Sequence, residues 1–119
     1  MEIVNIAEKL SSFTDHWSPK IIGELNGQQV RLSKFKGEFV WHHHENEDEM
    51  FLVIKGELTL GFRDGDKVLN EGEFIIVPKG VEHKPSAQEE VSVLMFEPAT
   101  ALNTGNLDND LTIMNLDRI

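Results

Sequence analysis

The sequence predicts an all-β fold with one short helix at its N-terminus. Short apolar runs follow one another from Ile21 to Phe96, and turn signals separate them at intervals of roughly 8 to 12 residues. The runs are too short and too closely spaced for helices to lie between them. This pattern is typical of a β-sandwich or a β-barrel.

The expected helix covers roughly residues 5 to 13. Asn5, followed by Glu8 three positions later, is the pattern of a capping box. Apolar residues then recur at helical spacing, at Ile6, Leu10 and Phe13. The Trp-Ser-Pro segment at 17–19 is expected to end the helix.

The strands are expected to follow in order, each between recognisable turns. Asn-Gly at 26–27 and Asp-Gly at 64–65 are strong hairpin signals, and they join strands at 21–25 and 28–35, and at 57–62 and 67–69. Further strands are expected at 39–44, 49–54, 74–77, 81–85 and 91–96. Residues 97–109 predict an irregular tail with at most one helical turn at 99–102, and residues 111–114 predict an edge strand.

Length and hydropathy predict a single domain, residues 1–119, with one hydrophobic core. Hydrophobic residues make up 39% of the chain, and no apolar run approaches the roughly 18 residues of a membrane span. The first residues lack the basic and apolar regions of a signal peptide. We therefore expect a cytoplasmic protein without membrane contact.

Charge and cysteine content narrow the partners and the chemistry. A formal net charge of -10 opposes the phosphate backbone, so we expect no nucleic-acid partner. The chain has no cysteine, which excludes disulfides, thiol catalysis and thiolate metal sites. Histidine, aspartate and glutamate are then the only strong metal ligands available.

Three of the five histidines lie together at positions 42 to 44. Alternate residues of a strand point to the same side, so His42 and His44 are expected to share one face and His43 to point the other way. After a polar turn the chain resumes at Glu49, on the same face as Phe51. If the two strands form a hairpin, both imidazoles and the Glu49 carboxylate can converge on one point.

The spacing of these residues resembles the two-motif signature of the cupin superfamily, a group of small jelly-roll β-barrels. The first motif is matched by His42-x-His44, four residues, Glu49, six residues and Gly56. The second motif is matched by Gly72, five residues, Pro78-x-Gly80-x-x-His83. Two positions depart from the signature: four rather than five residues separate Gly37 from His42, and Ala87 stands where asparagine is usual.

The resemblance implies a double-stranded β-helix, or jelly-roll barrel, with a metal-binding core at about residues 37–96. It implies that one divalent transition metal, Fe, Mn, Zn, Ni, Co or Cu, is bound by His42, His44, Glu49 and His83. It further implies a small-molecule ligand inside the barrel and a homodimer. The face of the strand that carries Met50, Leu52 and Ile54 is a candidate for the dimer interface.

A metal site with an open position suits an enzyme of oxygenase or isomerase type that acts on a small polar or carbonyl-containing molecule. A non-catalytic module that binds or senses a small molecule is the alternative, and no catalytic residue is identified. Arg31 is either a surface ion-pair partner or an anchor for a ligand carboxylate. The apolar residues expected to face inward are Val40, Phe51, Val53, Leu58, Leu60, Phe62, Phe74 and Ile76.

Overall fold

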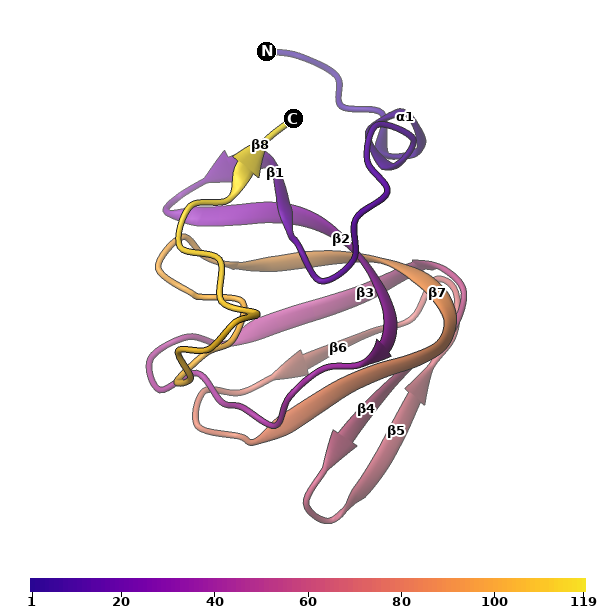
Figure 1. Cartoon of the computed structure of the whole chain (residues 1–119). Helices are drawn as coiled ribbons and strands as arrows, with labels where there is room; N and C mark the ends of the chain where they lie inside the picture. The colour runs from indigo at the N-terminus through magenta and orange to yellow at the C-terminus, as the bar shows by residue number, and fades with distance from the viewer.

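The alternating apolar runs form the strands of a jelly-roll barrel, and a short helix precedes them, which confirms the predicted fold class (Figure 1). The structure is a computed structural model that describes residues 1–119. Its elements are α1 (Ile6–Leu10), β1 (Lys20–Leu25), β2 (Gln28–Glu38), β3 (Glu49–Lys55), β4 (Leu58–Phe62), β5 (Gly65–Leu69), β6 (Phe74–Val77), β7 (His83–Pro98) and β8 (Asp117–Arg118).

Helix α1 begins where the capping box predicts but ends early. Asn5 Oδ1 accepts a hydrogen bond from the Glu8 backbone N–H at 2.9 Å. The hydroxyls of Ser11 and Ser12 donate to the carbonyls of Glu8 and Lys9, so these serines satisfy the last turn of the helix instead of extending it. The helix therefore stops at Leu10 and not at residue 13.

Strand β7 is the centre of the sheet, because it pairs with β2, β3 and β4, all antiparallel. It is one continuous strand, whereas the sequence predicted two separate strands at 81–85 and 91–96. The polar residues between them, Gln88 to Glu90, are exposed and do not interrupt the strand. Strand β7 thereby pairs with β4 near its start and with β3 near its end (Figure 1).

The core lies inside the barrel, where Phe51 and Val53 of β3 face Leu58 and Leu60 of β4 within one cluster of buried side chains. The prediction that Phe74 and Ile76 face inward is wrong, because their side chains are 61% and 57% exposed. Strand β6 pairs with β3 so that Val77 lies opposite Glu49, and Val77 is the buried residue. When four consecutive residues are all apolar, the sequence does not show which two of them face the core.

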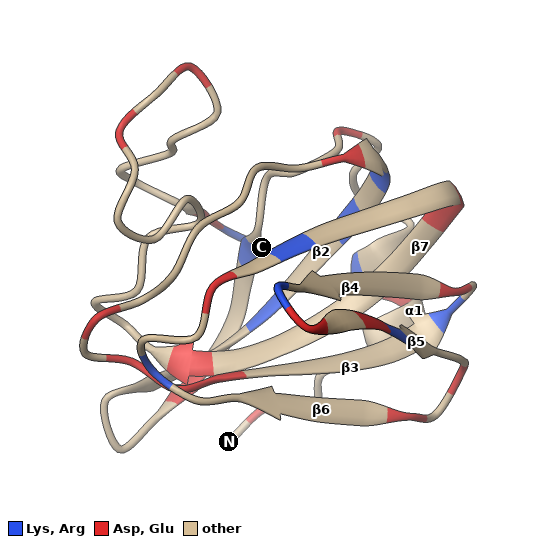
Figure 2. Cartoon of the chain, turned by 90° about the horizontal axis from the view of Figure 1, so that it is seen from below, with Lys and Arg blue, Asp and Glu red and all other residues tan.

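The C-terminal segment follows β7 along the side of the barrel and returns to β1 (yellow in Figure 1). The predicted edge strand at residues 111–114 is wrong. A two-residue strand, β8, pairs instead with β1 in parallel, with Asp117 opposite Lys20. Acidic residues lie mostly in turns and at strand ends around the molecule (Figure 2). The only helix, α1, is five residues long, far too short to cross a membrane.

Candidate metal centre

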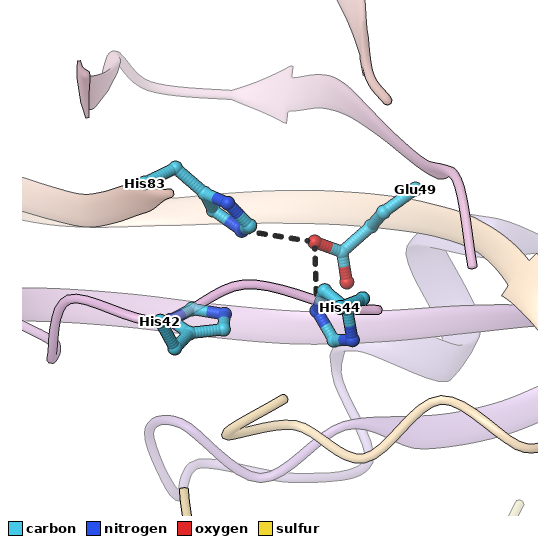
Figure 3. A group of neighbouring side chains, drawn as sticks. All are labelled: His42, His44, Glu49 and His83. Carbon is cyan, nitrogen blue, oxygen red and sulfur yellow. Dashed lines mark ion pairs between the residues drawn. The ribbon is translucent and has the colours of Figure 1, made fainter. Parts of the chain in front are cut away.

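Four side chains from three parts of the chain converge inside the barrel (Figure 3). His42 and His44 come from the connection between β2 and β3, Glu49 is the first residue of β3, and His83 is the first residue of β7. Their potential ligand atoms all lie within 4.8 Å of one another, and all four residues are buried. The structure thus brings together the four residues singled out in the sequence.

The segment that carries His42 and His44 is not the strand that the sequence predicted. Its one ladder contact is an isolated bridge in which His42 and His83 exchange backbone hydrogen bonds of 3.0 and 2.9 Å. The carbonyl of His44 accepts from the Gly80 N–H at 2.7 Å. These bonds tie both histidines to the chain around His83, so convergence comes from tertiary contacts and not from a local hairpin.

Two of the imidazoles are held in one tautomer by their own backbone. Nδ1 of His42 is 2.9 Å from the Val40 carbonyl, and Nδ1 of His83 is 2.9 Å from the Val81 carbonyl. A carbonyl oxygen only accepts, so each Nδ1 carries the proton and donates it. The Nε2 atom of each neutral ring then presents its lone pair to the centre, as in histidines that bind metals.

The polar atoms at the centre lack ordinary hydrogen-bond partners, which is costly inside a protein. His44 Nε2, His83 Nε2 and Glu49 Oε1 are buried without one. Glu49 Oε1 lies 3.5 Å from His44 Nε2 and 3.3 Å from His83 Nε2. Two ligands each about 2.1 Å from a metal ion are about 3.0 to 3.4 Å apart in octahedral or tetrahedral coordination, so these two distances are close to those between ligands of one small metal ion.

Burial and charge set the protonation of the site. Burial, helped by His83, lowers the pKa of His42 from 6.5 to about 4, so this imidazole is neutral at physiological pH. Burial by itself would lower the pKa of His44, but the Glu49 carboxylate beside it has the larger effect, and the pKa of His44 is raised. Burial would raise the pKa of Glu49, yet the neighbouring Glu97 carboxyl group and the His44 and His83 imidazoles hold this pKa well below its usual value.

Glu97 is a buried carboxyl group beside the site that the sequence analysis missed. Burial and the charge of Glu49 raise the pKa of Glu97 well above its usual value. The signal was present in the pattern of β7, where Val91, Val93 and Met95 face inward and Glu97 continues the same alternation.

Arg31 fits neither of its two expected roles. It is 1% exposed, so it is not a surface residue. Its guanidinium pairs with Glu97 and donates to the Gln29 side chain and to the carbonyls of Ala99 and Ala101. These contacts occupy all five N–H donors of the guanidinium, which leaves none to anchor a ligand carboxylate.

A small hollow is lined by two of the four residues, His42 and Glu49, and the centre of a water molecule can reach about 20 Å³ of it. Its wall is largely aromatic, and Trp17 stacks on Phe35 and Phe39 with ring centroids 4.4 and 4.7 Å apart. The residues that line it are Trp17, Pro19, Phe35, Phe39, His42, Glu49, Phe51, Pro85, Met95, Glu97 and Asn103. No lysine or arginine is among them.

His43 and the acidic turn after it lie outside the cluster. The His43 ring is 3.7 Å from the exposed Glu45 carboxylate and is not among the converging residues. Asp48 accepts a hydrogen bond from the Lys79 backbone N–H at 2.8 Å, which braces the turn. His43 therefore points away from the centre, as the alternation predicted.

Solved structures and curated proteins resemble this chain. A cupin-2 domain protein from Shewanella frigidimarina is 48% identical, with a TM-score of 0.80 over 81% of this chain and 94% of that one. The uncharacterized protein YdbB of Bacillus subtilis is 44% identical over 64 residues, which are 53% of this chain and 57% of that protein. Acireductone dioxygenase of Bacillus licheniformis is 29% identical over 75 residues, which are 59% of this chain and 42% of the enzyme.

The chain spans about half the length of these curated relatives. The family profile described as the cupin domain matches residues 26–97, which contain all four converging residues, all of β2 and nearly all of β7. This match covers more than half of the sequence and includes the strands that enclose the site. The chain belongs to the cupin domain family.

Proposed function

We propose that His42, His44, Glu49 and His83 bind one divalent transition metal, and that the loaded site is the active centre of an oxygenase or isomerase. The observation that carries this proposal is the set of buried nitrogen and oxygen atoms that face one another without hydrogen-bond partners. A metal bound there would act as a Lewis acid on a carbonyl or hydroxyl oxygen, because four protein ligands leave a coordination position free.

The lining of the hollow supports a small, uncharged polar or carbonyl-containing substrate with an apolar part. A phosphate would find no lysine or arginine in the wall, and Arg31 behind it has no free N–H donor. The aromatic wall built by Trp17, Phe35 and Phe39 would pack against the apolar part and exclude water. The partial similarity to acireductone dioxygenase also supports oxygenase chemistry on a small molecule.

The chain's own residues prepare the site before any metal arrives. The carbonyls of Val40 and Val81 hold the protons of His42 and His83 away from the centre. Glu49 supplies the negative charge that offsets part of the charge of a divalent ion. The Arg31–Glu97 pair lies behind Glu49 and limits the positions that its carboxylate can take.

The test is metal analysis of protein purified without a nickel column, followed by assays on the stripped and the reloaded protein. We expect about one metal ion per chain, its loss in His44→Ala, and its retention in His16→Ala, which removes an exposed histidine instead. Substrate screening would measure oxygen uptake and product formation with small carbonyl, enediol and phenolic compounds. Turnover that persists in fully metal-stripped protein contradicts the proposal.

The alternative function is a metal-anchored binding or sensing module without catalysis. One observation favours it: the other polar groups of the wall are already engaged. Trp17 Nε1 donates to the Lys36 carbonyl at 3.0 Å, and the Asn103 amide bonds to Leu111 and Ile113 at 2.7 and 2.9 Å. Such a module predicts that a ligand raises the melting temperature of the metal-loaded protein while no product forms.

We further propose that two copies associate through an outer apolar face, defined by Met50, Leu52, Phe74, Ile76, Leu94 and Phe96. The strand register places these side chains in two rows, with Met50 between Ile76 and Phe96, and Leu52 between Phe74 and Leu94. Strand β6 carries no charged residue between Phe74 and Val77 (Figure 2). Its outer side chains, Phe74 and Ile76, are more than half exposed. A second copy would cover this face symmetrically.

A further inference from the structure

The segment from Ala99 to Ile113, which we call the C-terminal strap, lies against the residues that carry two of the proposed metal ligands. It follows β7 and contains no helix or strand, yet Ala101 and Thr104 within it are 3% and 0% exposed. It lies beyond residues 26–97, the part that matches the family profile. The packing of the strap is therefore not part of the segment on which the family match rests.

Asn106 of the strap engages both backbone groups of His43. The Asn106 N–H donates to the His43 carbonyl at 2.9 Å, and the His43 N–H donates to Asn106 Oδ1 at 2.9 Å. His43 stands between His42 and His44, so these two bonds fix the peptide groups that link it to each neighbour. The side chain and the backbone of Asn106 thus make the hydrogen bonds to His43 that a neighbouring strand would otherwise make.

Gly105 brings the strap backbone into direct contact with the same segment. Its φ is +58°, and a Cβ added there would overlap the His43 carbonyl oxygen and lie 2.9 Å from His42 Cδ2. The obstructing atoms are a backbone carbonyl and a ring within a buried cluster, so they cannot move aside easily. Only glycine lets the strap approach the His42 imidazole this closely.

The strap is itself held rigid at several points. Arg31 donates to the carbonyls of Ala99 and Ala101 at its beginning. Asn103 bonds to the Leu111 carbonyl and the Ile113 N–H, and the hydroxyls of Thr104 and Thr112 are 2.6 Å apart. These contacts close the strap into a loop, and none of them involves His43. It can therefore impose a position on the histidine segment.

We propose that the strap is part of the metal centre, and that Asn106 and Gly105 are positioning residues that place His42 and His44 for the metal. The proposal rests on the proposed role of these histidines as ligands. On their other side, the residues from Val40 to Asp48 are held by the bridge to His83 and by hydrogen bonds from the Gly80 and Lys79 N–H groups. Without the strap, the segment would lose both hydrogen bonds to His43, the residue between the two imidazoles.

The test compares Asn106→Ala, Asn106→Asp and Gly105→Ala with the wild-type chain, using Co²⁺ as the metal. Affinity is measured by competition with a chelator, and the visible absorption spectrum of bound Co²⁺ reports its coordination. We expect Asn106→Ala and Gly105→Ala to bind about 10-fold to 100-fold more weakly, the range for residues that orient metal ligands, with an altered spectrum. Asn106→Asp keeps the acceptor oxygen and is expected to restore the affinity and the spectrum.

Gly72→Ala is the control, because Gly72 has a φ of +81° but open space around it, before β6. It carries comparable backbone strain and is expected to retain wild-type affinity. Wild-type affinity and spectrum in both Asn106→Ala and Gly105→Ala would overturn the role of the strap, while the proposed metal site would stand. Equal weakening in Gly72→Ala would also overturn it. A wild-type chain that binds no Co²⁺ would overturn both proposals, and this outcome is distinguishable from the others.

Discussion

Replacing Arg31 by methionine tests whether the buried cation organises the inside of the barrel. Arg31→Met removes the donors to Glu97, Gln29 and the carbonyls of Ala99 and Ala101. Ala99 is exposed, so water can replace the donor that its carbonyl loses. The acceptors on Glu97, Gln29 and Ala101 are on residues at most 6% exposed, and they would remain buried without a donor.

The size of the effect follows from that count. Each stranded acceptor costs about 1 to 3 kcal/mol, and breaking one side of a buried ion pair costs about 3 to 5 kcal/mol. We therefore expect the free energy of unfolding to fall by about 4 kcal/mol. For 119 residues the entropy of unfolding is about 0.25 kcal/mol/K, so the melting temperature should fall by about 16 °C.

Urea denaturation and thermal melts followed by circular dichroism measure both quantities. The matched control is Arg118→Met, because Arg118 pairs with Glu24 at 3.0 Å and is exposed. An exposed pair contributes at most about 1 kcal/mol, so this variant should melt close to the wild-type protein. If Arg31→Met loses no more stability than Arg118→Met, then the contacts of Arg31 do not hold the fold together, and the reasoning is refuted.

Three further predictions concern protonation, metal affinity and assembly. The pKa of His42 is about 4 in the folded protein and about 6.5 in the unfolded protein, so the unfolded protein binds more protons in this range. Lowering the pH from 7 to 4 should therefore lower the free energy of unfolding of the metal-free wild-type protein by about 3 kcal/mol more than that of His42→Asn. Urea denaturation that shows the same loss of stability in both proteins would contradict this prediction. Metal affinity should fall at least about 10-fold between pH 7.5 and 5.5, because the raised pKa of His44 lets a proton compete with the metal for this imidazole. Calorimetric titrations that give equal affinities at the two pH values would count against the three-histidine site. Analytical ultracentrifugation should show that the wild-type protein is a dimer and that Ile76→Glu is a monomer. Val68→Glu, at a similarly exposed position on β5, is the control and should remain a dimer. A monomeric wild-type protein would refute the proposed interface.

Much of this fold could be predicted because the signals are local. Turn pairs such as Asn-Gly at 26–27 and Asp-Gly at 64–65 mark hairpins that the structure contains, and the Asn5 cap begins the helix where expected. Alternation correctly separated His43 from His42 and His44 and placed Glu49 on the buried face of β3. The spacing of the two motifs identified the four residues that converge, because that spacing reflects the register of the barrel.

Other features depend on which segments meet, and no short stretch of sequence contains that information. The register between β6 and β3 decides which side chains of β6 face the core, and it turns Phe74 and Ile76 outward. The interior position of Arg31 depends on Glu97, 66 residues away, and on the carbonyls of the strap. A charged residue at an inward-facing position of a strand indicates that it has a buried partner, but only the structure shows whether that partner is a ligand or the protein itself.

By itself, the sequence determined the all-β class, the cupin resemblance and the identity of the four converging side chains, because periodicity and motif spacing are written along the chain. Only the tertiary structure decided how the histidine segment is held. That segment is not a strand, and its position depends on a bridge to His83 on one side and on Asn106 and Gly105 on the other. The physical reason is that an irregular segment has no internal hydrogen-bond pattern, so distant parts of the chain must supply its contacts.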